Sequence, residues 1–259
     1  MEIEKKVLDK GFVRVVDKMG DDFSIVQAAR ISYGSGTKHT SQDRALIRYL
    51  MRHRHTSPLE MCELKLHIKM PIFVMRQWVR HRTASVNEYS GRYSIMENEF
   101  YIPELENIAL QSEDNKQGRG EVFKKEEALK IRKIIEDQSK NAYEEYTKLL
   151  EKGVSRELAR TLLPQNIYTQ IYWKINLHNL LHFISLRSHS TSQFEIREFS
   201  KAIQEIVKEW VPMIYEAFCD YKLDSTNVSG KIKKYLEWNG EEPEGLGKTE
   251  LQEFHKEWK

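Results

Sequence analysis

The sequence predicts a helix-rich α+β fold, a single domain with a small, mostly antiparallel sheet. Residues 64–70 and 167–173 alternate between apolar and polar or small side chains, which is the period of a half-buried strand. Several longer segments instead repeat apolar residues at helical spacing and begin with capping residues. With 259 residues, of which 40% are hydrophobic, the chain can build one sizeable core.

The first elements follow from local signals. A strand is expected over residues 11–19, where Phe12-Val13-Arg14-Val15-Val16 is rich in β-branched residues. Asp21 and Asp22 can cap a helix that runs to residue 31, and a loop follows at residues 34–36. A second helix should begin after Thr40, where Thr40-Ser41-Gln42-Asp43 fits a capping box.

Two prolines punctuate the next stretch. Ser57-Pro58-Leu59-Glu60 combines a capping serine, proline at the first helical position and glutamate at N3, so a short helical turn should start there. Pro71 ends the strand at residues 64–70 and can begin a helix to about residue 82. Residues 83–101 show no clear period and predict a loop, and loops of such length are usually functional or disordered.

The second half is expected to be mainly helical. A surface excursion at residues 111–120 precedes a long helix from residue 121 to about 150. The buried side of that helix should carry Phe123, Leu129, Ile131, Ile135, Ala142, Tyr146 and Leu149. Three more helices are expected: one capped by Ser155 and ending at Pro164, an apolar one capped by Asn176, and a long one from Ser192 toward residue 221 that Pro212 kinks.

Composition excludes several classes of protein. Lys plus Arg number 41 against 39 Asp plus Glu, so a formal net charge of +2 disfavours nucleic-acid binding. No apolar run approaches the ~20 residues of a transmembrane helix, and the N-terminus lacks a secretory signal. Two cysteines exclude a disulfide scaffold and a thiolate zinc site. We therefore expect a cytoplasmic protein with no membrane or nucleic-acid partner.

One stretch concentrates groups that bind anions. Arg80-His81-Arg82-Thr83-Ala84-Ser85-Val86-Asn87-Glu88-Tyr89-Ser90-Gly91-Arg92 begins at an expected helix end and runs into the long loop. Arginine offers paired planar donors to phosphate, and Glu88 can accept from ribose hydroxyls. The alternative is a basic helix end that matches the helix dipole, followed by an ordinary loop.

This stretch resembles the signature of the flavin-dependent thymidylate synthases, Arg-His-Arg-x-x-Ser-x-Asn-Glu-x-Ser-x-Arg, with every fixed position occupied. The resemblance extends over about residues 11–221, including the segments at residues 57–60, 156–160, 163–164 and 181–187. It implies the thymidylate synthase-complementing fold over residues 1–221. Residues 222–259 are then a polar C-terminal extension.

The resemblance implies an enzyme that methylates dUMP reductively to dTMP. Members of the family are homotetramers with active sites shared between subunits, each holding FAD and dUMP. Methylenetetrahydrofolate donates the one-carbon unit and becomes tetrahydrofolate, and NADPH reduces the flavin. No metal is implied.

The resemblance also implies roles for individual residues. Arg187 would face the uracil ring as the catalytic residue. The positions similar to cofactor-binding ones are Ser57, Arg80, His81, Arg82, Glu88, Asn176, Leu177, His178 and His182. The positions similar to substrate-binding ones are Gln77, Trp78, Val79, Arg80, Glu88, Tyr89, Ser90, Gly91, Arg92, Arg160 and Arg187. His55 is a further candidate for the approach of folate or nicotinamide.

The residue types suit this chemistry. Arginine stays protonated, so Arg187 could not act as a base but could stabilise negative charge developing on the uracil ring. The alternative for Arg187 is a helix-end arginine paired with a carbonyl. Neither Cys62 nor Cys219 lies beside a motif. We therefore expect catalysis without a cysteine nucleophile, which would need an activated thiolate.

Other patterns are weaker. His178 and His182 have a metal-binding spacing, but Asn179 stands where a zincin needs glutamate. Gly245-Leu246-Gly247-Lys248-Thr249 imitates the end of a P-loop without its first glycine, and Gly34-Ser35-Gly36 is no dinucleotide fingerprint. Two rival functions stay open: nucleic-acid binding through Arg76, Arg80, Arg82 and Tyr89, and a metal-dependent phosphohydrolase.

Overall fold

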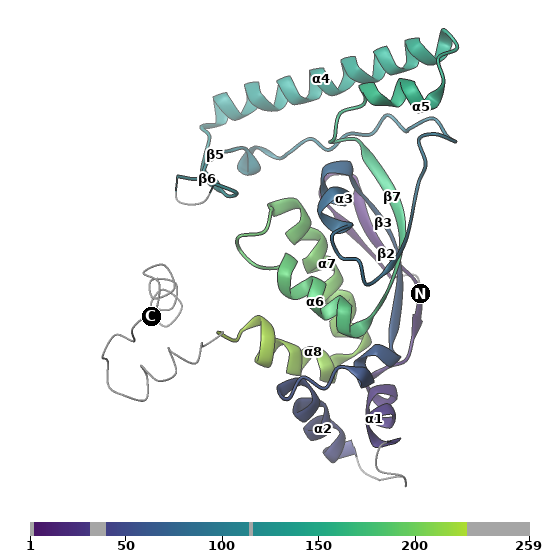
Figure 1. The fold of residues 1–259 in the computed structure, drawn as a ribbon. Helices are drawn as coiled ribbons and strands as arrows, with labels where there is room; N and C mark the ends of the chain where they lie inside the picture. Colours follow the sequence, from purple (N-terminus) through teal and green to yellow (C-terminus); the bar gives the residue numbers. More distant parts are fainter. Residues whose placement is uncertain (1–2, 32–39, 114–115, 227–259) are drawn as a thin grey trace, which may run out of the picture.

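The structure, a computed structural model, describes residues 3–31, 40–113 and 116–226. Its centre is a five-stranded sheet in the order β1-β2-β3-β7-β4, and every neighbouring pair is antiparallel (Figure 1). The strands are β1 (Glu4–Val7), β2 (Gly11–Met19), β3 (Glu63–Pro71), β7 (Tyr168–Asn176) and β4 (Ser85–Glu88). The expected loop at residues 34–36 and the P-loop-like segment lie outside the described residues.

The two central strands have the predicted alternation. Leu64, Leu66, Ile68 and Met70 of β3 are fully buried, and Trp173 of β7 pairs with Leu66 across the ladder. The intervening Lys65 and the paired Lys174 point to the exposed face. One face of the sheet is therefore apolar and covered, and the other is polar.

The two edge strands of this sheet, β1 and β4, were not predicted from the sequence. β4 lies within the segment that was expected to be a loop, and all four of its residues are exposed. An edge strand with no buried face shows no apolar alternation, so period alone could not reveal it. β1 has four residues, too few for a period to be counted.

Three helices cover the apolar face of the sheet (Figure 1). They are α3 (Ile72–Trp78), α6 (Leu177–Arg187) and α7 (Phe194–Trp210). Trp78 of α3 meets Trp173, Phe183 and Phe199 with ring centroids 4.5 to 6.0 Å apart. This aromatic cluster joins the three helices to the sheet.

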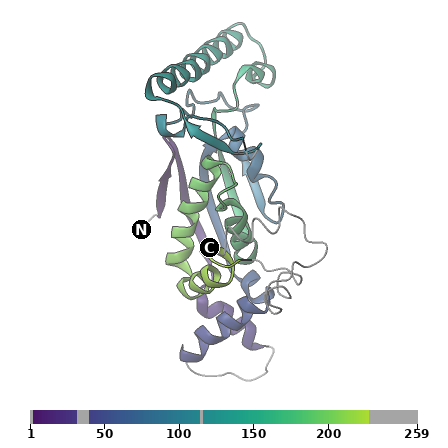
Figure 2. The same ribbon diagram turned by 90° about the vertical axis from the view of Figure 1, so that its left-hand side faces the viewer.

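The two ends of the molecule differ (Figures 1 and 2). At one end lie α1 (Asp22–Arg30), α2 (Thr40–Arg52) and α8 (Pro212–Phe218). At the other end lie the hairpin of β5 (Ala109–Gln111) and β6 (Arg119–Val122), and α4 (Lys125–Glu151) with α5 (Arg156–Ala159). Arg187, the catalytic candidate, ends α6, which lies between these ends.

Capping explains several boundaries. Asp21 caps α1 as expected, in a capping box with Ser24. Asp22 caps a different helix, because its buried carboxylate accepts from the backbone N–H groups of Met213 and Ile214 at 3.0 Å each. Pro212 does more than kink the last helix. It separates α7 from α8, since proline cannot supply the backbone donor that a continuous helix requires.

Some predicted boundaries were wrong. The helical turn η2 (Ser57–Met61) forms, but Thr56 is its N-cap and no side chain caps it. The last long helix has Gln193 rather than Ser192 as its N-cap, because the Ser192 hydroxyl donates to the Leu186 carbonyl. One continuous helix was expected from Ser155 to Pro164. The structure instead has α5 and then the separate turn η4 (Arg160–Leu162). Ser155 is at the N-cap position of α5, but its side chain makes no capping hydrogen bond.

Two further helices differ from expectation. α3 ends at Trp78, four residues early, because the chain turns to place His81 against Phe183. α4 begins at Lys125, four residues late, because residues 119–122 form β6. Leu129, expected on the buried side, is 47% exposed, since α4 lies at the periphery and packs only a narrow stripe. None of the described helices is long and apolar enough to span a membrane.

Candidate active site

The first part of the site joins the C-terminal ends of α3 and α6. Arg187, the last residue of α6, donates through Nε to Nε2 of His81 at 2.9 Å. Its Nη2 donates to the main-chain carbonyl of Gln77 at 3.1 Å. Because arginine has only donors, His81 must accept at Nε2 and is therefore neutral in this arrangement.

Electrostatics favours the same protonation state. The pKa of His81 is lowered to about 4, first by burial, then by the positive charge of Arg187 and by the electrostatic effect of the neighbouring His182. Burial also lowers the pKa of Arg187, but a guanidinium remains protonated at neutral pH. The pair thus carries one fixed positive charge, located on Arg187.

The second part of the site is built on the edge strand β4. The Tyr89 N–H donates to the Gln170 carbonyl at 2.9 Å and extends the sheet by one bond. Glu88 accepts at Oε1 from the Thr169 hydroxyl, also at 2.9 Å. A cavity of about 290 Å³ opens beside these residues, and its lining includes Glu88, Tyr89, Ser90, Gly91, Arg160 and Thr169.

Gly91 lies close to two side chains of the cavity. A Cβ at this position would lie 3.0 Å from Met96 Sδ and 3.3 Å from Arg160 Cδ. Without a side chain, the backbone approaches the arginine closely and leaves space beside it. Such a place, with a guanidinium and a nearby hydroxyl from Ser90, suits a phosphate.

Three arginines of the motif lie outside this cavity. Arg92 forms an exposed ion pair with Glu157 at 2.7 Å. Arg80 and Arg82 are exposed, and neither forms an ion pair with the residues that the structure describes. Their guanidiniums are thus available to an anionic ligand.

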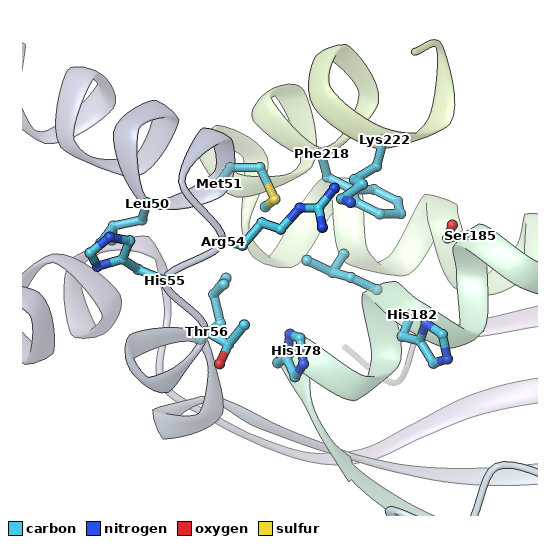
Figure 3. Close-up of a pocket in the computed structure, with 12 residues that line it drawn as sticks. Leu50, Met51, Arg54, His55, Thr56, His178, His182, Ser185, Phe218 and Lys222 are labelled. Carbon is cyan, nitrogen blue, oxygen red and sulfur yellow. The ribbon is translucent and has the colours of Figure 1, made fainter. Parts of the chain in front are cut away.

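The third part of the site is a pocket of about 210 Å³ beside α6, where the α2–η2 connection meets α8 (Figure 3). His178 and His182 of α6 line it together with Arg54, His55 and Lys222. Its apolar lining includes Leu50, Met51, Leu59, Leu181 and Phe218, and none of the described residues that line it is a carboxylate. The pocket offers an apolar floor with a cationic rim.

The remaining candidates have other surroundings. Ser57 lines a neighbouring depression that shares His55 with the third part. Asn176 uses its Oδ1 to cap α6 by accepting from the Asn179 N–H at 2.9 Å. Trp78 and Leu177 have their side chains in the core, so only their backbone could meet a ligand, whereas Val79 is exposed.

Comparison with known proteins settles the family. A family model described as thymidylate synthase complementing protein matches residues 14–213. The chain belongs to this family. It is 58% identical to a flavin-dependent thymidylate synthase of Ehrlichia ruminantium (strain Gardel), over 97% of this chain and 86% of that protein. It is 53% identical to one of Rickettsia bellii (strain RML369-C), over 97% of this chain and 92% of the relative.

A solved structure of the family agrees in fold. A UMP/dUMP methylase, PolB from Streptomyces cacaoi bound with 5-Br dUMP, superposes with a TM-score of 0.77 at 31% sequence identity. The match covers 84% of this chain and 98% of that chain. The predicted family, the predicted α+β fold and the prediction of an enzyme are confirmed.

Several residues of the third part were missed by the sequence analysis. Arg54 adopts a left-handed backbone with φ of 58°, which turns the chain between α2 and η2. Lys222 and Phe218 come from the far end of the described chain and line the same pocket as Arg54 (Figure 3). No motif marks these three positions, and their proximity arises only from the packing of α8 against α2.

Neither cysteine has the environment of a nucleophile. Burial raises the pKa of the Cys62 thiol to about 11, and the nearby Asp21 and Asp22 add to the effect. Burial also raises the pKa of Cys219. Neither residue lines any of the three parts of the site. A raised pKa leaves little thiolate at neutral pH, and the thiolate is the reactive form.

The described residues contain no cluster of candidate metal ligands. Across residues 3–31, 40–113 and 116–226, no three histidine, cysteine, aspartate or glutamate side chains gather in a way that could hold a metal ion. His178 and His182 instead line the third part of the site together with cationic groups.

Proposed function

We propose that this chain methylates dUMP reductively to dTMP, with methylenetetrahydrofolate as the one-carbon donor, NADPH as the reductant and tetrahydrofolate as the second product. The observation that carries the proposal is the Arg187 guanidinium, held by neutral His81 and the Gln77 carbonyl. Relatives that share more than half of this sequence are named flavin-dependent thymidylate synthases, and a solved relative binds 5-Br dUMP.

Arg187 is assigned the catalytic role. Two of its five N–H donors are used by His81 and Gln77, which leaves three for a ligand. Directed at the uracil ring, these donors stabilise the negative charge that develops on N3 and the adjacent carbonyl oxygens. Stabilising that charge makes C5 a better nucleophile. The held orientation means that the guanidinium need not reorganise when the charge appears.

The substrate phosphate is assigned to the cavity beside β4. Its lining combines the Arg160 guanidinium, the Ser90 hydroxyl and the backbone at Gly91. Arg92 can reach the same anion by exchanging its exposed partner Glu157, because an exposed ion pair contributes little stability. Tyr89 and Glu88 line the same cavity and are assigned to the nucleoside.

FAD is assigned to the third part of the site. An apolar floor accepts a flat ring system, and a rim of Arg54, His178, His182 and Lys222 without carboxylates accepts a pyrophosphate. Exposed Arg80 and Arg82 are further contacts for the cofactor's phosphates. When bound, the flavin supplies the reducing equivalents that it receives from NADPH.

The complete site is assigned to a homotetramer. The second and third parts of the site form separate cavities within one chain, the first part lines neither of them, and the motif arginines Arg80 and Arg82 are exposed. The free edge of β4 carries Val86, a large exposed apolar residue. A second copy that covers this edge would bring its own cavities against these arginines. Gel filtration with light scattering should therefore show four chains per particle.

The proposal includes catalysis without an enzyme cysteine. The double variant Cys62→Ala and Cys219→Ala should still form dTMP, within about threefold of the parent, because both thiols are held protonated by burial. Total loss of activity in a folded, FAD-loaded variant would show that a thiolate takes part. Circular dichroism and flavin absorbance identify the folded, loaded state.

The deciding experiment follows the flavin spectrum of the purified protein under anaerobic conditions. Addition of NADPH should bleach the flavin absorbance, and later addition of dUMP with methylenetetrahydrofolate should restore it while dTMP accumulates. A colourless protein whose oligonucleotide binding falls steeply with salt would instead favour nucleic-acid binding. Activity that chelators abolish would favour a metal-dependent phosphohydrolase.

A further inference from the structure

A buried carboxylate lies behind the candidate site, at a position to which the proposed mechanism gives no role. Glu195, in the first turn of α7, is 1% exposed. Its Oε1 accepts from the Tyr101 hydroxyl at 3.2 Å and from Nη2 of Arg119, which belongs to the β5–β6 hairpin. Its Oε2 accepts from Nε2 of Gln193 at 2.9 Å. A carboxylate this deeply buried needs such donors to remain charged.

Glu195 determines how the Gln193 side chain is oriented. An ionised carboxylate only accepts hydrogen bonds, so the Gln193 amide must turn its NH₂ group toward Glu195. The Gln193 oxygen then points the other way, where it accepts from Nε2 of Gln77. That bond in turn fixes which end of the Gln77 amide faces Gln193. The charged Glu195 thus orients the Gln193 amide, which in turn orients the Gln77 amide.

Gln77 is therefore held from two sides. Its side chain is bonded to Gln193, and its main-chain carbonyl accepts from Arg187 at 3.1 Å. The second N–H of its amide and its Oε1 are not used by these bonds. A side chain fixed before a ligand arrives loses less conformational entropy on binding, which strengthens the binding.

We propose that Gln193 and Glu195 are positioning residues that orient the Gln77 amide toward dUMP. The inference rests on the proposed function, since it needs dUMP as the ligand of Gln77. Arg119 then has a distant role, because it neutralises the carboxylate from which the orientation starts. The competing explanation is that the same bonds only stabilise the fold.

The first test measures dUMP binding to the FAD-loaded protein by calorimetry. Gln193→Met keeps the length of the side chain and removes its amide. We expect dUMP to bind about two- to tenfold more weakly, the range that corresponds to one hydrogen bond. FAD content should stay unchanged. Unchanged dUMP affinity in a folded variant would overturn the proposal.

Gln204→Met is the matched control. Gln204 lies on α7, the helix that Gln193 precedes, is also half-buried, and donates through Nε2 to the Ser188 hydroxyl at 2.8 Å rather than to Gln77. A purely structural role predicts that the two variants lose melting temperature and dUMP affinity alike. A positioning role predicts weaker dUMP binding for Gln193→Met only.

A double-mutant cycle identifies the route. In a Gln77→Met background, adding Gln193→Met should weaken dUMP binding no further, because the amide to be oriented is already gone. Additive losses would show that Gln193 acts by another path and would overturn the proposal. If Gln193→Met does not fold, Glu195→Gln replaces it in the same cycle, since its carboxamide no longer dictates the orientation of Gln193.

The outcome also separates this inference from the proposed function. A parent protein that binds dUMP, with variants that bind it equally well, contradicts only the positioning role. A parent protein that binds FAD but no dUMP contradicts the proposed function and the positioning role together.

Discussion

The two halves of the signature motif are supported in different ways. In the first half, His81 packs on Phe183 with ring centroids 4.7 Å apart and accepts from Arg187, next to the aromatic cluster around Trp78. The second half lies on β4, whose residues are all exposed, and Arg92 continues it with an exposed ion pair. One half is fixed by the core, and the other by sheet hydrogen bonds at an edge.

The difference shows where the site is organised before a ligand binds. A charge that must stabilise a transition state works best when it is already oriented, which the core provides for Arg187. A phosphate can be gathered by side chains that rearrange on binding. Changes in the first half should therefore alter stability and rate, whereas changes in the second half should alter substrate affinity alone.

The largest expected effect tests the core support of the first half. Trp78→Ala should lower the free energy of unfolding by about 3–5 kcal/mol, because it empties a fully buried position among three aromatic rings. Urea unfolding followed by circular dichroism measures the change. Trp78→Phe is the matched control. It should cost less, since the indole N–H finds no acceptor among the described residues.

The next effect concerns the charge itself. Arg187→Lys should lower kcat by about 10²–10³-fold, because an ammonium cannot both hold His81 and Gln77 and present a planar fork to the ring. Stopped assays of dTMP formation measure the rate, and calorimetry measures dUMP affinity. A kcat within threefold of the parent would remove Arg187 from the catalytic role.

The third prediction concerns the dependence of stability on pH. The pKa of His81 is about 4 in the folded protein against 6.5 ordinarily, so the unfolded chain binds more protons between these values. The free energy of unfolding should therefore fall as pH drops from 6.5 toward 4, by at most about 3 kcal/mol. His81→Asn should remove this part of the pH dependence. Equal slopes in both proteins would place the proton uptake elsewhere.

The smallest effect on stability is expected in the second half. Arg92→Ala should change the free energy of unfolding by less than about 1 kcal/mol, because both partners of its ion pair with Glu157 are more than half exposed. It should nevertheless raise KM for dUMP by about tenfold, the loss of one charge-assisted bond to phosphate. Glu157→Gln, the control, should leave KM near its parent value. A stability loss as large as that of Trp78→Ala would show that the two halves do not differ.

The sequence predicted those parts of the fold whose pattern is local. β3 and β7 showed alternation because one face is buried, and Asp21 and Asn176 were correctly identified as caps. β4 could not be predicted, since an exposed edge strand has no apolar period. The early end of α3 depends on the packing of His81 against Phe183, which is not a local property.

The motif residues of the candidate site could be predicted from the sequence, but the residues that surround and orient them could not. The residues of the motif were named from resemblance, and the structure places Glu88, Ser90, Gly91 and Arg160 around one cavity. Their assigned roles stay predictions. Arg54, Lys222 and Gln193 carried no signal, because each acquires its place from an element distant in sequence. The division between residues 1–221 and 222–259 also stays a prediction, and η5 (Cys219–Leu223) continues across it.

The bond from Asp22 to the start of α8 has a consequence for biosynthesis. The Asp22 carboxylate holds the N–H groups of residues 191 and 192 positions later in the chain. These residues begin α8, and α8 with the turn η5 after it places Phe218 and Lys222 in the third part of the site. The pocket therefore cannot form until the ribosome has synthesised α8 and the residues that follow it. A ribosome-bound nascent chain would have its signature motif long before the third part of the site is complete.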